Sequence, residues 1–318
     1  MARDPRRLRI LTWHVHGNYL YYLTQVPHEF HLVVDDERSV HHSGRSGTLP
    51  WGPNVHEAHV DRIREMEFDV ILFQSRKAYE EEQFRLLSPA QQRLPRIYLE
   101  HDPPQEHPTN TRHWVNDRNV LLVHCTPFNA LMWDCGDSPT QVIEHGVRLL
   151  APARYSGELE RGVVVVNNIG ARGRRLGADV FAQAAEQVPL TLVGMNAEQV
   201  GGHGEVSNAE LPGFMARHRF FFNPIRYTSL GLSIIEAMMV GLPIVGLATT
   251  ELVTVIRNGE NGFVDTRPER LVEAMQALLR DPAEARRLGE AARRTAEERF
   301  NIGRFVEGWE QALRTVAG

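Results

Sequence analysis

The segment that decides the fold reads Asn223-Pro-Ile-Arg-Tyr-Thr-Ser-Leu-Gly-Leu-Ser-Ile-Ile-Glu-Ala-Met-Met-Val-Gly-Leu-Pro-Ile-Val-Gly246. It follows the apolar run Arg219–Phe222 and ends in a second run, Pro243–Gly246, so it predicts a strand, a loop, a helix, a turn and a strand. The helix is expected to begin near Leu232 or Ser233, with its free backbone N–H groups directed at the loop. The segment therefore predicts an α/β unit with an anion site at a helix N-terminus.

Short apolar runs alternate with helical periods along the whole chain, which favours two doubly wound α/β domains over other fold classes. The stretch Arg148–Arg161 has no clear periodicity and is the expected linker, so the domains are predicted at 1–150 and 151–302. The tail Pro282–Ala317 predicts two helices with a break at Phe300–Gly303. The expected strands are Leu8–Trp13, His31–Val34, Val70–Phe73, Arg96–Leu99, Val120–His124, Gln141–Ile143, Gly162–Val166, Leu190–Val193, Arg219–Phe222 and Pro243–Gly246.

The composition is that of an ordinary globular protein: 42% of the 318 residues are apolar, 24% are charged and the net charge is −5. The sequence shows no basic domain, so nucleic acid is not an expected partner. The two cysteines, Cys125 and Cys135, fit a reducing compartment, and no apolar run is long enough to span a membrane. We therefore expect a cytoplasmic protein with no transmembrane segment. The arginines among residues 3–9 predict a solvated terminus, with weak peripheral contact at the inner membrane face as the alternative.

Glu236 is the first candidate for chemistry. It lies about one turn inside the predicted helix, where a carboxylate can accept hydrogen bonds from vicinal hydroxyls, as an acidic residue does for ribose in dinucleotide-binding folds. The structural alternative is that Glu236 complements the helix dipole while Gly231 only makes a turn. Taken alone, the two residues leave both interpretations open.

The whole segment resembles the donor-binding motif of glycosyltransferase family 4, the glycosyl transferases group 1, which are retaining enzymes with the GT-B fold. Gly231-Leu232 matches the family's Gly-Leu, Glu236-Ala237-Met238 its Glu-Ala-Met, and Gly241-Leu242-Pro243-Ile244-Val245 the turn and strand after the helix. The segment Glu251–Val264 resembles a further part of the family pattern. Weaker likeness covers nearly the entire chain, including a final helix, 303–318, which in this family crosses back onto the N-terminal domain.

The resemblance implies two Rossmann-like domains facing a cleft, with the acceptor on the side of the first and the donor bound by the second. It implies that Glu236 binds the ribose of a nucleotide sugar and that amides around Leu230–Leu232 meet the sugar or the diphosphate. Thr228 stands where the family has its first glutamate, so it offers a hydroxyl without a charge. Similarly, Thr250-Glu251 occupies the place of a frequent Gly-Gly. The donor-binding candidates in this segment are Thr228, Ser229, Leu230, Gly231, Leu232 and Glu236.

A second loop supplies cations. The stretch Asn167–Asp179 follows a predicted strand and carries Arg172, Arg174 and Arg175 on a turn punctuated by glycines. It resembles the family's Gly-Arg-x4-Lys-Gly loop, in which Arg172 takes the arginine role and Arg174 or Arg175 the lysine role. Such cations hold the phosphates and stabilise a diphosphate leaving group, and arginine suits bidentate phosphate contact. The alternative is a solvated turn in an arginine-rich chain whose single lysine is Lys77.

The candidate catalytic residues are His101 of the first domain and, from the arginine loop, Arg172 and Arg175, while Arg174 is a donor-binding candidate. His101 follows the predicted strand Arg96–Leu99, at the strand end where parallel sheets bind ligands. The family places a histidine here that approaches the donor sugar; a structural loop histidine is the alternative. After the first strand, Gly17 resembles the family's glycine-rich loop and is a donor-binding candidate, and Asn18 and Tyr19 are expected on the acceptor or diphosphate side.

The 15 histidines invite a zinc interpretation, but none has a metal-site spacing such as His-Glu-x-x-His. We therefore expect no metal and no cofactor besides the nucleotide sugar that serves as donor substrate. The predicted function is metal-independent transfer of a sugar, with retention, from a UDP- or GDP-type donor to a glycan, lipid or small-molecule acceptor. The alternatives are a UDP-N-acetylglucosamine 2-epimerase-like enzyme and a protein that binds a nucleotide sugar without transferring it.

Overall fold

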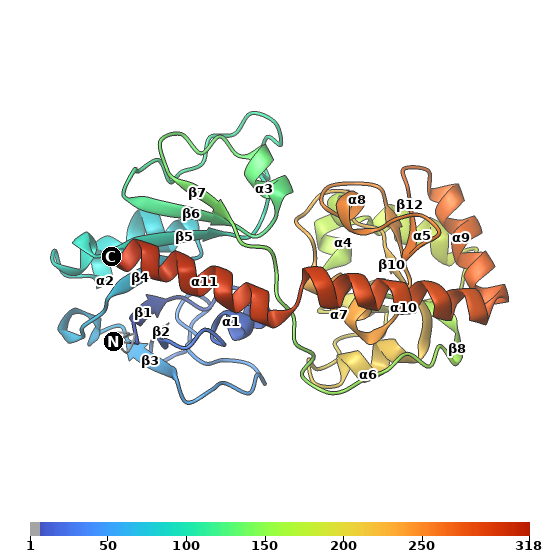
Figure 1. The fold of residues 1–318 in the computed structure, drawn as a ribbon, viewed down its shortest axis with the longest axis horizontal. Helices are drawn as coiled ribbons and strands as arrows, with labels where there is room; N and C mark the ends of the chain where they lie inside the picture. The colour runs from blue at the N-terminus through green and yellow to red at the C-terminus, as the bar shows by residue number, and fades with distance from the viewer. Residues whose placement is uncertain (1–6) are drawn as a thin grey trace, which may run out of the picture. The chain divides into compact units, whose positions relative to one another are not determined.

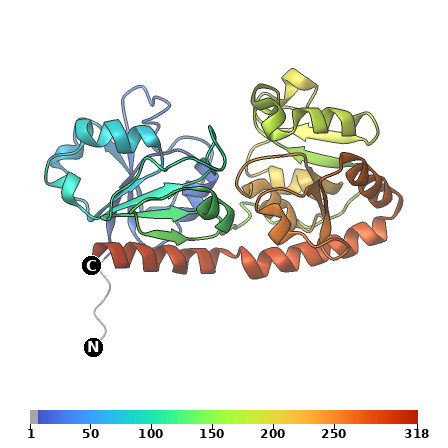
Figure 2. The same ribbon diagram turned by 90° about the horizontal axis from the view of Figure 1, so that it is seen from above.

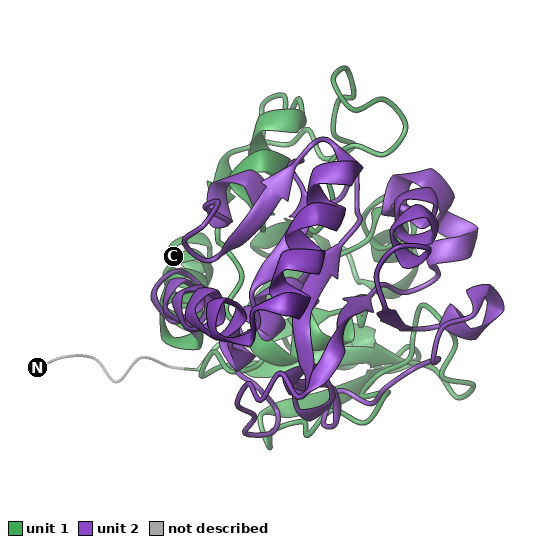
Figure 3. Ribbon diagram, turned by 90° about the vertical axis from the view of Figure 1, so that its right-hand side faces the viewer, with its two compact units in different colours: residues 1–146, 302–318 green, residues 147–301 purple. Residues whose placement is uncertain are grey.

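A computed structural model describes residues 7–318 of the chain. These residues form two compact units (Figure 3): unit 1 comprises residues 7–146 and 302–318, and unit 2 comprises Val147–Asn301. The division falls after Gly146, a few residues before the expected boundary at 150, and the chain returns to unit 1 at Ile302.

Unit 1 contains a parallel seven-stranded sheet in the order β3-β2-β1-β4-β5-β6-β7 (Figure 1). The order of the strands reverses between β1 and β4, which makes their carboxyl ends the topological switch point of this sheet. The strands are β1 (Arg9–Thr12), β2 (Glu29–Val34), β3 (Val55–His59), β4 (Val70–Phe73), β5 (Arg96–Glu100), β6 (Val120–His124) and β7 (Thr140–Val142). The helices are α1 (Gly17–Leu23), α2 (Gln83–Leu86), α3 (Pro127–Met132) and α11 (Ile302–Ala317), with the short 3-10 helices η1 (Ile63–Glu65) and η3 (Gln91–Arg93) and the π-helix η2 (Ala78–Glu82).

Unit 2 contains a parallel five-stranded sheet in the order β12-β11-β10-β8-β9, with its switch point between β8 and β10. The strands are β8 (Leu159–Val165), β9 (Leu190–Val193), β10 (His218–Asn223), β11 (Ile244–Leu247) and β12 (Gly262–Asp265). The helices are α4 (Ile169–Arg172), α5 (Ala178–Ala185), α6 (Leu211–Ala216), α7 (Leu232–Val240), α8 (Leu252–Val255), α9 (Pro268–Arg280) and α10 (Pro282–Arg299), with short turns η4 (Gly173–Leu176) and η5 (Ala197–Val200). The expected α/β class with two Rossmann-like sheets is confirmed.

The central strands are covered on both faces. All residues of β4, Val-Ile-Leu-Phe, are buried, and so are all residues of β10, His-Arg-Phe-Phe-Phe-Asn. A continuous buried run of this kind belongs in the middle of a parallel sheet with helices on both sides. The one charge inside β10, Arg219, donates hydrogen bonds to the carbonyl oxygens of Gly157 and Leu279, each at 2.9 Å, so the buried guanidinium is satisfied.

The two tail helices form as predicted. Asp281 caps α10, because its side chain accepts a hydrogen bond of 3.0 Å from the backbone N–H of Glu284. The next helix, α11, buries Phe305, Trp309 and Leu313 on one face. It contacts α1 and β4 of unit 1, and Figures 1 and 2 show it lying against that unit. The final helix therefore returns to the first unit, as the family resemblance implied.

Candidate functional site

The switch point of unit 2 brings together the two loops that the sequence singled out. The arginine loop follows β8, the loop 224–231 follows β10, and these strands are neighbours in the sheet. The backbone carbonyl of Arg175 accepts hydrogen bonds from the N–H groups of Arg226 at 3.0 Å and Tyr227 at 3.2 Å. In doubly wound folds, the crevice outside such strand ends is where ligands bind.

Gly177 allows the two loops to approach each other. It adopts a φ of +79°, and a Cβ atom built on it would lie 1.9 Å from the carbonyl oxygen of Pro224. A side chain at this position would therefore force the loops apart in addition to straining the backbone. The glycine of the arginine loop is thus required by a close backbone contact.

The three arginines of this loop differ in exposure and in ion pairing. Arg174, whose side chain is 77% exposed, is ion-paired with Asp179. Arg226, which sequence reasoning did not select, donates a second set of hydrogen bonds to Asp179, and these lower the pKa of that carboxyl to about 2. Arg175 is half-buried, and within residues 7–318 its guanidinium makes no ion pair. Arg172 is exposed at the end of α4.

The remaining donor candidates lie on the other loop and on α7. Ser229 and Leu230 are buried, whereas Thr228, Gly231 and Leu232 are half-buried. Gly231 is the extended residue before α7, so the first N–H groups of this nine-residue helix begin at the end of the loop. Glu236 lies one turn into α7 and is 7% exposed.

The departure at Thr250-Glu251 has a structural explanation. Thr250 adopts a φ of +51°, a conformation that glycine tolerates and a β-branched residue rarely adopts. Glu251 is 1% exposed and points at Arg299 of α10, with 2.9 Å between carboxylate and guanidinium. Glu251 therefore forms a buried ion pair inside unit 2. Thr250 adopts the left-handed backbone conformation that a glycine would adopt there, at the cost of strain.

In unit 1, His101 lies just beyond β5, next to the switch point. Its Nε2 is 3.1 Å from Oε1 of Gln74, which follows β4 directly. Gln74 is 4% exposed, and its Nε2 donates to Oγ1 of Thr12 at 2.9 Å and to the carbonyl of Trp13 at 2.8 Å. A carbonyl oxygen can only accept, so the amide orientation of Gln74 is determined and its Oε1 faces His101.

This arrangement selects one tautomer of His101. Because Gln74 offers an acceptor, Nε2 of His101 carries the proton and donates it. Burial, followed by the neighbouring His16 and His145, lowers the pKa of His101 well below its usual value, so the ring is neutral. The second nitrogen, Nδ1, is then a hydrogen-bond acceptor. The carbonyl of His101 is held as well, by Nδ2 of Asn129 at 3.0 Å.

Two buried aromatic residues, Tyr19 and Trp309, hold His101 in place. The ring of Tyr19 meets it edge-on, with 4.8 Å between centroids, and the hydroxyl of Tyr19 accepts a hydrogen bond of 3.2 Å from Nε1 of Trp309 on α11. Tyr19 is 1% exposed, so the expectation that it faces acceptor or diphosphate is wrong; it supports the histidine instead. Gly17 is the first residue of α1, where a Cβ atom would lie 3.2 Å from Nε2 of His14.

Glu100, the residue before His101, forms a buried pair with His113. Its Oε1 accepts from the backbone N–H of Asp102 at 2.9 Å, and its Oε2 lies 3.0 Å from Nε2 of His113. Since Nδ1 of His113 accepts from the N–H of Val115 at 2.9 Å, Nε2 carries the proton. Burial raises the pKa of Glu100 to about 8 and lowers that of His113 to about 3.

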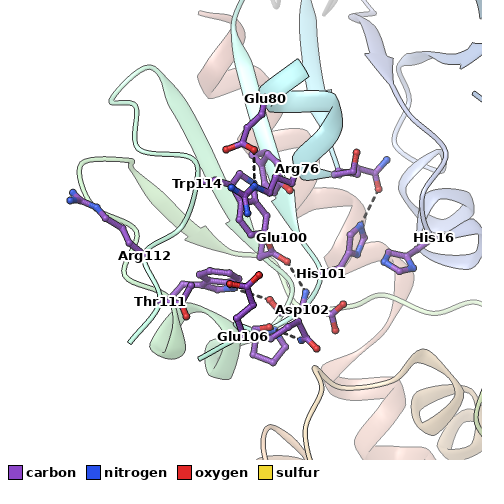
Figure 4. Close-up of a pocket in the computed structure, with 16 residues that line it drawn as sticks. His16, Arg76, Glu80, Glu100, His101, Asp102, Glu106, Thr111, Arg112 and Trp114 are labelled. Carbon is purple, nitrogen blue, oxygen red and sulfur yellow. Dashed lines mark hydrogen bonds and ion pairs between the residues drawn. The ribbon is translucent and has the colours of Figure 1, made fainter. Parts of the chain in front are cut away.

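A cavity of about 560 Å³ in unit 1 opens beside these residues (Figure 4). His101 and His16 lie on one side of it, with 4.3 Å between ring centroids. The other lining residues come from the segment that follows β4, from the end of β5 and from the segments that follow β5. They are Gln74, Ser75, Arg76, Glu80, Tyr98, Glu100, Asp102, Pro103, Gln105, Glu106, Thr111, Arg112, Trp114 and Trp133.

Three further expectations concern surfaces and ions. The part of the chain that the structure describes contains no cluster of three or more side chains arranged to hold a metal ion. Nor does any helix within it have the length and apolar character needed to cross a membrane. Of the arginines among residues 3–9, Arg3 and Arg6 lie outside the described residues, whereas Arg7 pairs with Glu29 and Arg9 with Asp69.

Comparison with known families bears on unit 2. Residues 194–295, which include the 224–231 loop and α7, match the model of the family described as glycosyl transferases group 1. The family resemblance is confirmed for this segment. Among curated proteins, the chain is 26% identical over 145 residues to trehalose synthase from Pyrococcus horikoshii, and 32% identical over 110 residues to sucrose synthase from Denitrovibrio acetiphilus. These alignments cover 46% and 32% of the chain but only 31% and 14% of the relatives, so the chain matches less than a third of their length.

Solved structures resemble the chain over nearly its full length. Sucrose-phosphate synthase from Thermosynechococcus elongatus aligns with a TM-score of 0.70 and 19% identity, covering 98% of this chain and 99% of that one. HepE of Anabaena, in a structure with UDP and glucose, aligns with a TM-score of 0.71 and 15% identity, covering 97% and 100%. At such identities the likeness concerns the fold, which is the two-domain GT-B architecture.

Proposed function

We propose that the chain transfers a sugar from a nucleotide diphosphate sugar to an acceptor hydroxyl, with retention of configuration and without a metal ion. One observation carries the proposal most directly. Arg175 is half-buried, its guanidinium makes no ion pair within the described residues, and its backbone carbonyl is hydrogen-bonded to the loop that leads into α7. This loop lies within residues 194–295, which match a glycosyltransferase family. A guanidinium without a counter-ion, on a loop whose backbone contacts the loop that leads into a helix N-terminus, suits a diphosphate.

The proposed roles follow from the chemistry of each group. Charge develops on the diphosphate as the glycosidic bond breaks, and Arg172, Arg175 and the N–H groups at the start of α7 stabilise it. Glu236 accepts hydrogen bonds from the ribose hydroxyls, and the residues from Thr228 to Leu232 contact the sugar or the diphosphate. In retention, the acceptor oxygen bonds to the anomeric carbon on the face that the diphosphate leaves, and the departing phosphate oxygen receives the acceptor proton.

His101 is assigned to the transferred sugar as a hydrogen-bond acceptor. Its Nε2–H is occupied by Gln74, so a sugar hydroxyl would donate to Nδ1. In the proposed division of labour, unit 2 holds the donor and unit 1 the acceptor. A UDP-type donor is the first to test, because HepE, a protein of the same fold, has been solved with UDP and with UDP-glucose.

Arg175 and Arg174 provide a matched pair for the first experiment. Arg175→Ala should weaken UDP binding by about ten- to hundredfold, the range for hydrogen bonds to charged groups of about 1.5–3 kcal/mol. Arg174→Ala should change the affinity little, because Arg174 is exposed and already paired with Asp179. Calorimetric titration with UDP, GDP, ADP and dTDP measures both variants. Equal losses in the two variants, or no binding of any nucleotide, contradict the proposal.

Measurements of UDP release and of the reaction products distinguish the proposed transferase from the two alternative functions. A sugar transferase releases UDP faster when acceptor is present, and the product anomer, read by proton NMR, keeps the configuration of the donor. Formation of the 2-epimer of UDP-N-acetylglucosamine without acceptor would indicate epimerisation, which the family match does not favour. Nucleotide binding without any UDP release, even by slow donor hydrolysis, would indicate a protein that only binds the nucleotide sugar.

A further inference from the structure

The cavity of unit 1 has a distinct chemical character that bears on the acceptor. Its volume of about 560 Å³ falls within the range of about 300–1,000 Å³ that small-ligand sites occupy. His101 is part of its lining, so a molecule bound in the cavity lies beside the residue assigned to the transferred sugar. The composition of the remaining lining therefore indicates which acceptors fit.

Charge is the first criterion. Arg76 is already paired with Glu80, with 2.7 Å between guanidinium and carboxylate. Two further carboxylates, those of Asp102 and Glu106, line the cavity against one further arginine, Arg112. Glu100 also lines it, but its pKa of about 8 keeps that carboxyl mainly protonated near neutral pH. The Arg112 side chain is 58% exposed and lies 4.0 Å from Asp134, another carboxylate. Because Asp134 lies beside Arg112, the cavity keeps an excess of carboxylates, those of Asp102 and Glu106, which repel a phosphate or carboxylate and accept hydrogen bonds from hydroxyls.

Two indole rings form a rigid corner of the same cavity. Trp114 and Trp133 have their centroids 5.3 Å apart and their planes at 81°. Nε1 of Trp133 donates to the carbonyl of Asp102 at 2.9 Å, and the guanidinium carbon of Arg76 lies 5.3 Å from the centre of the Trp114 ring. Figure 4 shows Arg76 and Glu80 gathered at Trp114. Both rings are held in place, so a ligand would not have to order them.

We propose that this cavity binds a non-anionic saccharide as the acceptor of the transfer reaction. The proposal rests on the transferase function proposed above and specifies its acceptor. Indole rings pack against the apolar C–H face of a sugar ring, while Asp102 and Glu106 accept hydrogen bonds from its hydroxyls. The same carboxylates disfavour sugar phosphates, sugar acids and the phosphate groups of lipids as acceptors.

Quenching of tryptophan fluorescence in the full chain, with UDP present, measures acceptor binding directly. The probes are maltose and methyl α-glucoside against glucose 6-phosphate and glucuronate. We expect each neutral sugar to bind at least about tenfold more tightly than either anion, since each added negative charge faces the carboxylates of Asp102 and Glu106. Equal or tighter binding of an anionic sugar, or no response to any of the four, overturns the proposal. UDP affinity in the same samples reports separately on the proposed transferase function.

Two variants and their controls localise the effect. Glu106→Arg should tighten glucose 6-phosphate by about tenfold while leaving UDP affinity unchanged, because Glu106 is exposed at the cavity and lies in unit 1. Glu65→Arg, an exposed reversal outside the lining, should leave all four sugars unchanged. Trp114→Leu should weaken maltose by about tenfold, and Trp51→Leu, also outside the lining, should not. Equal effects of a variant and its control contradict the assignment of the cavity.

Discussion

Replacing Gln74 by leucine removes the group that orients His101 while keeping a side chain of similar size. The substitution deletes three hydrogen bonds, those to Thr12 at 2.9 Å, to Trp13 at 2.8 Å and to His101 at 3.1 Å. At about 1 kcal/mol for each bond, we expect the free energy of unfolding to fall by about 3 kcal/mol. Loss of the bond to Nε2 should also shift the tautomer ratio of His101 by about fivefold toward the Nδ1–H form.

Gln91 provides a matched control in the same unit. It is 6% exposed, its Nε2 donates to the carbonyls of Ile63 at 2.7 Å and Met66 at 2.8 Å, and its Oε1 accepts from the N–H of Ser88 at 2.8 Å. Gln91→Leu should therefore cost about the same 3 kcal/mol of stability without any effect on His101. The comparison separates a general loss of stability from a specific loss of orientation.

The assay combines chemical denaturation, nitrogen-15 NMR of the imidazoles and steady-state kinetics. Gln74→Leu should move the nitrogen shifts of His101 toward the other tautomer and lower kcat by about fivefold, with UDP affinity intact because the nucleotide is assigned to unit 2. Gln91→Leu should leave the shifts and kcat at the values of the parent. If Gln74→Leu keeps the Nε2–H tautomer, or if both variants lose the same activity, Gln74 does not position His101.

Four further outcomes are expected. Gly177→Ala should abolish UDP binding or folding, because its Cβ would lie 1.9 Å from a carbonyl oxygen of the other loop. Gly173 has a φ of +55° and no atom within 4 Å of a built Cβ, so Gly173→Ala should cost only about 1–2 kcal/mol of stability. Equal losses of UDP binding and stability in the two variants contradict the close-contact argument. Glu236→Ala should weaken UDP by about tenfold or more, and EDTA should leave transfer unchanged; rescue of chelated enzyme by magnesium would oppose the arginine account. The free energy of unfolding should be greatest at about pH 6.5. The pKa of Glu100 is raised to about 8, so its contribution to stability is lost as the pH rises from about 4.5 to 8. Buried imidazoles with lowered pKa values contribute stability that is lost as the pH falls below about 6.5. Denaturation at several pH values tests this, and in Glu100→Gln the decline above pH 6.5 should disappear. The imidazoles concerned, with pKa values of about 4, 3 and 4, are those of His31, His113 and His124.

The strands that sequence analysis missed are both at sheet edges. β3 (Val55–His59) and β12 (Gly262–Asp265) each have one neighbouring strand, and most of their residues are only half-buried. An edge strand that packs on few neighbours needs no continuous apolar run, so the pattern that revealed β4 and β10 is absent from it. The central strands and the tail helices, which are buried by many partners, were predicted to within a few residues.

The rule that selected His101, that a polar residue just past the carboxyl end of a parallel strand is a site candidate, applies to Gln74 as well. Gln74 is the polar residue directly after the buried run of β4, at the carboxyl end of a strand beside the switch point. Its role nevertheless depends on partners far away in sequence, Thr12 and His101, which a linear pattern does not connect. Tyr19 was misjudged for a related reason, since its burial is completed by Trp309, at the other end of the chain.

The assignment among the arginines shows what decides function once a motif has been located. Motif spacing left Arg174 and Arg175 equivalent, because both follow the same glycine on the same turn. The distinction comes from Asp179, which neutralises Arg174 and is also held by Arg226 from the neighbouring loop. An ion-paired, exposed guanidinium gains little from a second anion, whereas a half-buried one without a counter-ion gains a full charge-assisted hydrogen bond. The distribution of acids therefore directs the proposed diphosphate to Arg175, which is why the Arg175→Ala and Arg174→Ala pair discriminates more sharply than removal of the whole cluster.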